Sequence, residues 1–230
     1  MITRLGKWLL ILLSVLALDV SQAQDWPNLQ RFQKENIALL AGERNKNLIV
    51  FMGNSITEGW SNIRPEFFED KPYVNRGIGG QTTPQMLLRF RQDVIQLRPM
   101  AVVILAGIND IAGNTGPATI EMIYDNMVSM VELAQASEIK VLLCSVLPAA
   151  DFPWRPGLKP AEKVIALNDR LKAYAREQQL IYVDYFSAMA NPSNGLKEDL
   201  GSDGVHPNEK GYRVMEPILE EALVLLEKND

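Results

Sequence analysis

The sequence predicts a single α/β domain of three layers, with a parallel sheet between two layers of helices. Three observations support this. Short apolar runs recur along the chain, each run is continuous rather than alternating, and amphipathic stretches of helical period separate them. A continuous apolar run is typical of a strand buried on both faces, as in parallel sheets covered by helices. Such strands are joined by right-handed crossovers.

Five segments are expected to form the strands. They are rich in β-branched and aliphatic residues, and turn-forming residues follow most of them. The expected strands are residues 48–52, 72–75, 101–105, 141–146 and 181–185, of which 72–75 is the weakest.

The segments between the strands have helical periodicity. In the first, Leu29, Phe32, Ile37 and Leu40 fall roughly on one face, which predicts that this face is buried. Proline is favoured in the first turn of a helix, so Pro84 marks the start of the second. The expected helices are residues 29–40, 83–97, 117–137, 161–178 and 212–227, and a further helix is expected to open at Ser55.

Residues 1–23 have the pattern of a secretory signal peptide. Arg4 and Lys7 precede an apolar run at residues 8–18, and small residues at 21 and 23 fit a cut after Ala23. The run is shorter than the roughly 20 residues that a membrane span needs, and no cysteine near the cut suits a lipid anchor. We therefore expect one mature domain at residues 24–230, exported to the periplasm or the cell exterior. An uncleaved N-terminal anchor is the alternative.

Charge and residue counts exclude several functional classes. The formal net charge is −5 and no basic block is present, which argues against nucleic acid as a partner. The single cysteine, Cys144, cannot form an intramolecular disulfide. No set of residues has metal-ligand spacing, so no metal is expected. Acid–base chemistry by an imidazole would have to use His206, the single histidine.

Polar, glycine-rich turns follow three of the expected strands. Residues 53–55 follow the first strand, residues 77–80 the second and residues 107–110 the third. In open α/β sheets, ligands bind at the carboxyl ends of the strands. We therefore expect these turns to meet at one edge of the sheet.

Ser55 and His206 are the candidate nucleophile and base. Ser55 follows a buried strand, where it serves either as a helix N-cap or as a nucleophile. Asp203 precedes His206 by three residues in a loop framed by Gly204 and Pro207. Its carboxylate can hold one imidazole nitrogen and leave the other to accept the serine proton. An aspartate cap beside a surface histidine is the structural alternative.

Gly80 and Asn109 are candidate donors to an oxyanion. A glycine can present a bare backbone N–H, and an asparagine can present a side-chain amide. The N–H of Ser55, at a helix start, would be a third donor. Each of these residues also suits an ordinary turn, but the full set at successive strand ends points to acyl transfer.

Four short motifs, taken in order, resemble the blocks of the SGNH hydrolases, also called the GDSL esterase/lipase family. They are Gly53-Asn54-Ser55, Gly80, Gly107-Ile108-Asn109-Asp110 and Asp203-x-x-His206. The resemblance implies a flavodoxin-like α/β/α sandwich with five parallel strands and no cofactor. It also implies that Ser55 is the nucleophile, that Gly80 and Asn109 hold the oxyanion, and that Asp203 and His206 complete the triad.

Three positions depart from the family pattern or leave it ambiguous. Asn54 and Gln81 stand where the family often has aspartate, and Gly79 competes with Gly80 for the role of oxyanion donor. None of these positions belongs to the triad.

The resemblance leaves the substrate open, because members of the family cleave acyl esters of lipids, sugars and small alcohols. The proline-rich loop at residues 148–157 carries Phe152, Trp154 and Arg155. It would suit the alcohol side of an ester, such as a sugar ring, or it is simply a packed surface loop. Its prolines make it a poor lid, so we expect short acyl groups, acetyl above all, on carbohydrate. Trp60 is a second candidate wall, although its expected place is the core.

Three other functions are alternatives to a short-chain esterase. They are a lipase or lysophospholipase-type acylhydrolase of the same mechanism, a non-catalytic carbohydrate-binding relative, and a nucleotide-binding module. The last would need a phosphate loop with a lysine, which residues 53–60 lack. The expected partner is a small-molecule or oligosaccharide ester, with no nucleic acid and no stable membrane insertion. The sequence leaves the oligomeric state open.

Overall fold

Five parallel strands form one sheet at the centre of the molecule, in the order β2-β1-β3-β4-β5. This is the strand order of the flavodoxin-like doubly wound sheet, and it confirms the predicted fold class. The computed structural model describes residues 25–228, so the predicted export signal lies outside the described residues. The strands are β1 (Ile49–Gly53), β2 (Tyr73–Gly77), β3 (Ala101–Leu105), β4 (Lys140–Cys144) and β5 (Ile181–Val183).

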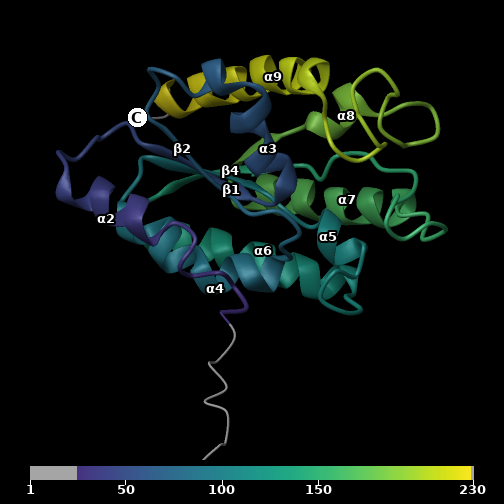
Figure 1. The fold of residues 1–230 in the computed structure, drawn as a ribbon, viewed down its shortest axis with the longest axis horizontal. Helices are drawn as coiled ribbons and strands as arrows, with labels where there is room; N and C mark the ends of the chain where they lie inside the picture. Colours follow the sequence, from purple (N-terminus) through teal and green to yellow (C-terminus); the bar gives the residue numbers. More distant parts are fainter. Residues whose placement is uncertain (1–24, 229–230) are drawn as a thin grey trace, which may run out of the picture.

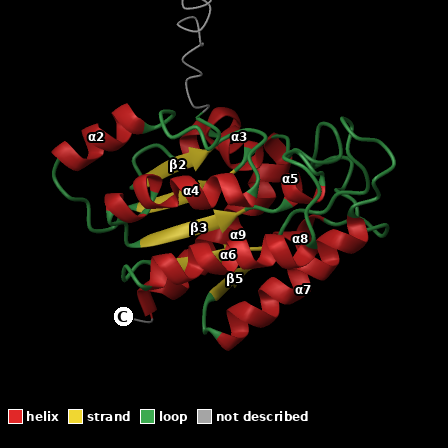
Figure 2. Cartoon of the chain, turned by 90° about the horizontal axis from the view of Figure 1, so that it is seen from below, coloured by secondary structure: helices red, strands yellow, loops and turns green. Residues whose placement is uncertain are grey.

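Helices cover both faces of the sheet (Figures 1 and 2). One layer contains α3 (Ser55–Ile63), α8 (Tyr185–Met189) and α9 (Glu209–Lys228), and the other contains α4 (Thr83–Asp93), α6 (Ile120–Gln135) and α7 (Ala161–Glu177). Two further helices are α2 (Gln33–Ala41) and the single turn α5 (Ile108–Ile111). Because both faces are covered, β1 and β3 are buried along their whole length, which explains their continuous apolar sequences. None of the helices within residues 25–228 is long and apolar enough to cross a membrane.

The predicted buried face of the first helix is wrong in part. Phe32 is buried, but Ile37 and Leu40 are 60% and 54% exposed. The helix begins only at Gln33 and turns Asn36 toward the protein, where its side-chain amide donates to Asp93 Oδ1 at 2.7 Å. A buried polar contact, rather than an apolar stripe, therefore orients α2.

Two boundaries differ from the prediction for local reasons. The helix expected over residues 83–97 ends at Asp93 and is followed by a separate 3-10 turn, Ile95–Leu97. The strand expected over residues 181–185 stops at Val183, because the Asp184 carboxylate accepts from the Ser187 N–H and caps α8.

The end of β2 lies directly against the backbone of α3. A Cβ on Gly77 would lie 2.1 Å from the backbone nitrogen of Glu58 and 2.8 Å from the carbonyl oxygen of Asn54. Only glycine allows this approach, which fixes the start of α3 against the sheet.

We expect Gly77→Ala to destabilise the protein by about 1–3 kcal/mol, the usual cost of overpacking a rigid site. Gly42→Ala is the matched control, since its new Cβ would meet atoms no closer than 3.6 Å. Urea unfolding of both variants measures the difference. Equal stability of the two variants would contradict the close approach of β2 to α3.

Candidate active site

Ser55 is the first residue of α3, and its hydroxyl is not used as a helix cap. The cap is Asn54, whose Oδ1 accepts from the Ile56 N–H at 3.0 Å. Ser55 Oγ instead lies 2.9 Å from Nε2 of His206. The capping alternative for Ser55 is therefore wrong, and asparagine at position 54 supplies the capping oxygen in place of aspartate.

Asp203 holds the opposite side of the His206 ring. Its Oδ2 lies 2.8 Å from His206 Nδ1, and its Oδ1 accepts from the N–H groups of Val205 at 3.0 Å and of His206 at 2.8 Å. Gly204 adopts a left-handed φ of +82°, which folds this turn. Burial by itself would raise the pKa of Asp203, but hydrogen bonds from His206 and Val205 outweigh it and hold the pKa below its ordinary value. The carboxylate therefore stays ionised beside the imidazole.

Contacts between α9 and α3 bring the two distant segments together. The Tyr212 hydroxyl donates to the carbonyl oxygen of Ile56 at 2.8 Å. The buried guanidinium of Arg64 donates to both carboxylate oxygens of Glu216, at 2.8 and 3.1 Å. These bonds fix the helix that follows His206 onto the helix that begins with Ser55.

Gly80 presents an N–H group with no hydrogen-bond acceptor among residues 25–228. Its φ is +76°, and a Cβ built on it would meet nothing within 4 Å, so open space lies beside it. The N–H of Gly79, in contrast, donates to Glu58 Oε2 at 3.0 Å. Gly80 is thus the better candidate donor of the two glycines.

The side chain of Asn109 is buried at the end of β3. One hydrogen of its amide binds the carbonyl oxygen of Gln81 at 3.0 Å. A side-chain amide has two hydrogens to donate, so this bond fixes the amide and leaves the second hydrogen for a ligand. The bond therefore joins the loop that carries Asn109 to the loop that carries Gly80.

The rim of the site contains Trp154, from the loop that the sequence offered either as a wall for the alcohol side or as a packed surface loop. The indole of Trp154 is 41% exposed, and its centroid lies 5.9 Å from that of the His206 ring. Its Nε1 donates to Asn114 Oδ1 at 3.3 Å, and the Asn114 amide donates to the Gly80 carbonyl at 3.2 Å. Trp60, the other candidate wall, is 1% exposed and stacks on Phe67 in the core.

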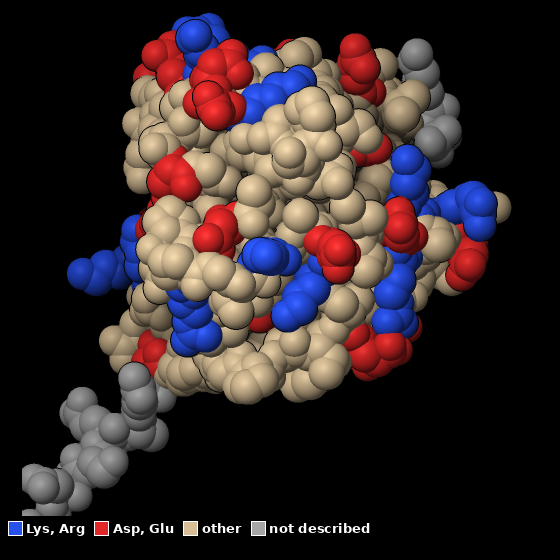
Figure 3. Space-filling view, turned by 90° about the vertical axis from the view of Figure 1, so that its right-hand side faces the viewer, with Lys and Arg blue, Asp and Glu red and all other residues tan. Residues whose placement is uncertain are grey.

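The carboxyl edge of the sheet has a mixed surface. Figure 3 looks onto this edge and shows acidic and basic side chains scattered among neutral ones, with no continuous basic area. No cluster of three metal-ligating side chains is found among the described residues.

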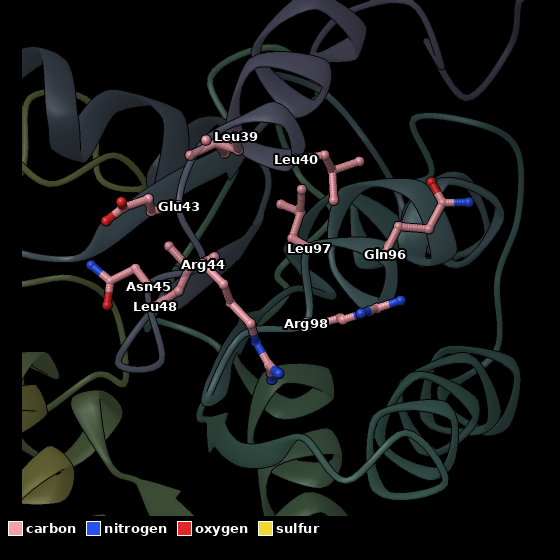
Figure 4. Close-up of a pocket in the computed structure, with 10 residues that line it drawn as sticks. Leu39, Leu40, Glu43, Arg44, Asn45, Leu48, Gln96, Leu97 and Arg98 are labelled. Carbon is pink, nitrogen blue, oxygen red and sulfur yellow. The ribbon is translucent and has the colours of Figure 1, made fainter.

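A separate hollow of about 290 Å³ lies at the amino ends of the strands (Figure 4). It is lined by Leu39, Leu40, Leu48 and Leu97 together with Arg44 and Arg98. It lies at the opposite edge of the sheet from Ser55 and contains none of the candidate site residues.

Known proteins support the resemblance seen in the sequence. The profile of the GDSL-like lipase/acylhydrolase family matches residues 51–214. The chain belongs to this family. A solved structure from Bacteroides fragilis, a candidate acylhydrolase, is 49% identical, covers 90% of this chain and 99% of its own, and superposes with a TM-score of 0.85.

Two curated relatives are esterases. Esterase TesA of Pseudomonas aeruginosa is 26% identical over 183 residues, which cover 74% of this chain and 85% of that protein. An acetylxylan esterase of Xylanibacter ruminicola is 25% identical over 211 residues, covering 76% of this chain and 42% of that protein. This chain is therefore a GDSL-family esterase or acylhydrolase.

Sequence reasoning missed the buried side chains that hydrogen-bond to the loops of this GDSL-family site from the protein interior. Arg89 is completely buried and donates to the Gly53 carbonyl oxygen at 3.0 Å and to Gln81 Oε1 at 2.6 Å. An arginine in an amphipathic stretch normally faces solvent. The pairing of Arg89 with Asp93 one helical turn later was the one signal available.

Asp110 is a buried carboxylate next to Asn109. It accepts from the N–H and hydroxyl of Thr83, the first residue of α4. Burial raises the pKa of Asp110 to about 6, although the hydrogen bonds from Thr83 oppose the shift. A pKa that is higher in the folded state favours folding at low pH, and that contribution is lost as pH rises through the folded pKa.

We expect Asp110→Asn to remove a pH dependence of stability, because asparagine keeps an acceptor oxygen without a charge. Between about pH 4 and pH 7, the free energy of unfolding of the wild type should fall relative to the variant by at most about 3 kcal/mol. Urea titrations across this range measure it. Parallel curves would show that Asp110 does not titrate as a buried acid.

Proposed function

We propose that the protein is an exported serine esterase that hydrolyses short acyl esters, acetyl above all, on carbohydrate. The observation that carries the proposal is the continuous chain from Ser55 Oγ to His206 Nε2 and from His206 Nδ1 to Asp203 Oδ2, at 2.9 and 2.8 Å. This is the geometry of a serine activated by a base that a carboxylate orients.

In the proposed mechanism, Ser55 Oγ attacks the ester carbonyl carbon while His206 Nε2 takes its proton. The negative oxygen then accepts from the N–H groups of Ser55 and Gly80 and from the side-chain amide of Asn109. Collapse breaks the bond to the alcohol oxygen, which takes the proton from His206. Water, deprotonated by the same nitrogen, releases the acid from Ser55 and completes the cycle.

The alcohol side of the site supports a carbohydrate. The exposed face of Trp154 beside His206 offers the apolar surface on which the C–H face of a sugar ring can lie. The same loop, through Phe152, Pro153 and Pro156, also borders a hollow of about 310 Å³ next to Asp203. The acetylxylan esterase among the relatives acts on a substrate of this class, to judge by its name.

The loop around Trp154 supports a short acyl group. Asp151 accepts from the N–H groups of Phe152 and Gly157, all at 2.9 Å, and the Arg155 N–H donates to the Phe152 carbonyl. Pro153 and Pro156 restrict the loop further. A loop closed on itself in this way is poorly suited to swing open over a long acyl chain.

The proposal of export rests on the N-terminal sequence alone. The charged start, the apolar run at residues 8–18 and the small residues before position 24 support secretion through a cleaved signal peptide. A mature N-terminus at Gln24, found by sequencing the secreted protein, would agree with this.

We expect Ser55→Ala to lower kcat by about four to six orders of magnitude, the usual cost of losing a triad member. Hydrolysis of nitrophenyl acetate and labelling by a phosphonate ester measure it. Ser61→Ala, the same change on the same helix, is the matched control and should keep full activity. A Ser55→Ala protein with a tenth of the wild-type rate would disprove the serine mechanism, and a wild type that takes up no phosphonate would indicate a binding protein.

We expect kcat/KM on nitrophenyl esters to be highest for acetate or butyrate and to decline by octanoate. Each methylene buried in a groove adds about 0.8 kcal/mol, or roughly fourfold in kcat/KM, so a deep acyl groove would show a steady rise with length. A series from two to ten acyl carbons tests this. A maximum at decanoate would favour the lipase or lysophospholipase alternative and leave the roles of Ser55 and His206 unchanged.

A further inference from the structure

A buried polar network lies behind the candidate oxyanion loop. The guanidinium of Arg76 donates to Asn36 Oδ1 at 2.6 and 3.0 Å, and the Asn36 amide donates to Asp93. Asp93 in turn accepts from Arg89 at 3.0 Å, and Arg89 donates to the Gln81 side chain. All five side chains are less than 7% exposed.

This network holds one more positive charge than negative. Burial lowers the pKa of Arg76 to about 10, an effect that the Asp93 carboxylate partly offsets, so the Arg76 guanidinium stays charged at neutral pH. Burying charged groups is costly unless every donor has a partner. The last partners of Arg89 are the Gly53 carbonyl, two residues before Ser55, and the Gln81 side chain. The network thus ends on the two loops that carry Ser55 and Gly80.

Gln81 connects three parts of the structure. Its Oε1 accepts from Arg89 at 2.6 Å, and its Nε2 donates to the carbonyl oxygen of Pro27 at 2.7 Å. Its backbone carbonyl accepts from the Asn109 amide at 3.0 Å. The side chain therefore fixes the peptide that holds Asn109 and that directly follows Gly80.

The contact with Pro27 belongs to a series of three. Gln81, Gln85 and Gln92 donate to the carbonyl oxygens of Pro27, Trp26 and Leu29 at 2.7, 2.8 and 2.5 Å. The segment at residues 26–29 thus lies along α4. Gln85 also accepts from the Thr82 N–H, but the contact with Gln81 is the one that reaches the residue directly after Gly80.

We propose that Gln81 is a positioning residue for the oxyanion site. It joins the buried Arg89 and the segment at residues 26–29 to the peptide that orients Gly80 and Asn109. The inference rests on the proposed function, since it explains what holds the proposed oxyanion donors Gly80 and Asn109 in place.

Gln81→Met tests this while keeping a similar volume. Arg89 itself is a poor target, because its removal would take away the guanidinium that pairs with the buried Asp93 carboxylate and endanger folding. Gln92→Met is the matched control. It makes the same change and removes the same kind of bond to residues 26–29, together with a long contact of 3.4 Å to Asp93, but lies away from Gly80.

We expect Gln81→Met to lower kcat on nitrophenyl acetate by about tenfold to a hundredfold, with KM changed by less than about threefold. The loss should be smaller than that for deleting an oxyanion donor, because the donors remain but are misplaced. Phosphonate labelling of Ser55 should slow by a similar factor. Gln92→Met should lower Tm less, because its side chain is half-buried and its loss leaves no buried guanidinium donor unpaired, and it should keep kcat within about twofold.

Gln81→Glu separates the two side-chain contacts. Its carboxylate still accepts from Arg89 and neutralises the excess positive charge, while the bond to Pro27 is lost. We expect it to keep most of the wild-type kcat. A Gln81→Glu protein as slow as Gln81→Met would overturn the role of the Arg89 contact.

Two results would overturn the proposal as a whole. One is wild-type kcat in Gln81→Met, and the other is an equal loss of kcat in Gln81→Met and Gln92→Met. Ser55→Ala, measured alongside, distinguishes failure of the positioning role from failure of the proposed esterase function. If Ser55→Ala is inactive and Gln81→Met is not, the positioning role alone fails, whereas an active Ser55→Ala protein refutes the proposed function itself.

Discussion

β1 pairs in register with β2 on one side and with β3 on the other, so that Gly53 lies between Gly77 and Leu105. The three loops that leave these residues therefore start side by side at one edge of the sheet. Each loop needs only two to four further residues to present Ser55, Gly80 or Asn109 there. His206 is the one distant member of the site, and the contacts of Tyr212 with Ile56 and of Arg64 with Glu216 bring its segment to α3.

The two halves of the site are held by different physical means. The His206 side is held by contacts between near neighbours in the sequence and is partly exposed. About a third of each side chain of Asp203 and His206 is accessible, and the Asp203 carboxylate accepts from backbone N–H groups of its own turn. The Gly80 and Asn109 side is held from the interior by charged groups with no solvent access. Exposed polar contacts contribute little and tolerate change, whereas buried ones are costly to leave unpaired. Substitutions behind the oxyanion loop should therefore disturb the molecule more than substitutions around Asp203.

The sequence was sufficient for the strands, their direction and the residues at the strand ends, because apolar periodicity and turn chemistry are local properties. It was also sufficient to pair Asp203 with His206, which lie within one turn. It could not show that Arg89 is buried, since an arginine normally faces solvent and an aspartate four residues later is also common on exposed helix faces. Nor could it orient α2, where the contact of Asn36 with Asp93 overrides the pattern set by Ile37 and Leu40. Polar contacts between residues far apart in the sequence produce no periodic pattern, so the sequence does not predict them.

Asn114 ties the alcohol side of the proposed site to its oxyanion side. Its side-chain oxygen accepts from the indole of Trp154, and its amide donates to the carbonyl of Gly80. A ring that lies on Trp154 would therefore contact a side chain that is linked, through Asn114, to the peptide of a proposed oxyanion donor. Contacts with the alcohol can in this way affect the position of the donors to the developing oxyanion. Binding energy that is realised only in the transition state raises kcat rather than lowering KM. A substrate whose alcohol fills the space beside Trp154 should for this reason be turned over faster than a small ester with the same acyl group, even when the two bind equally well.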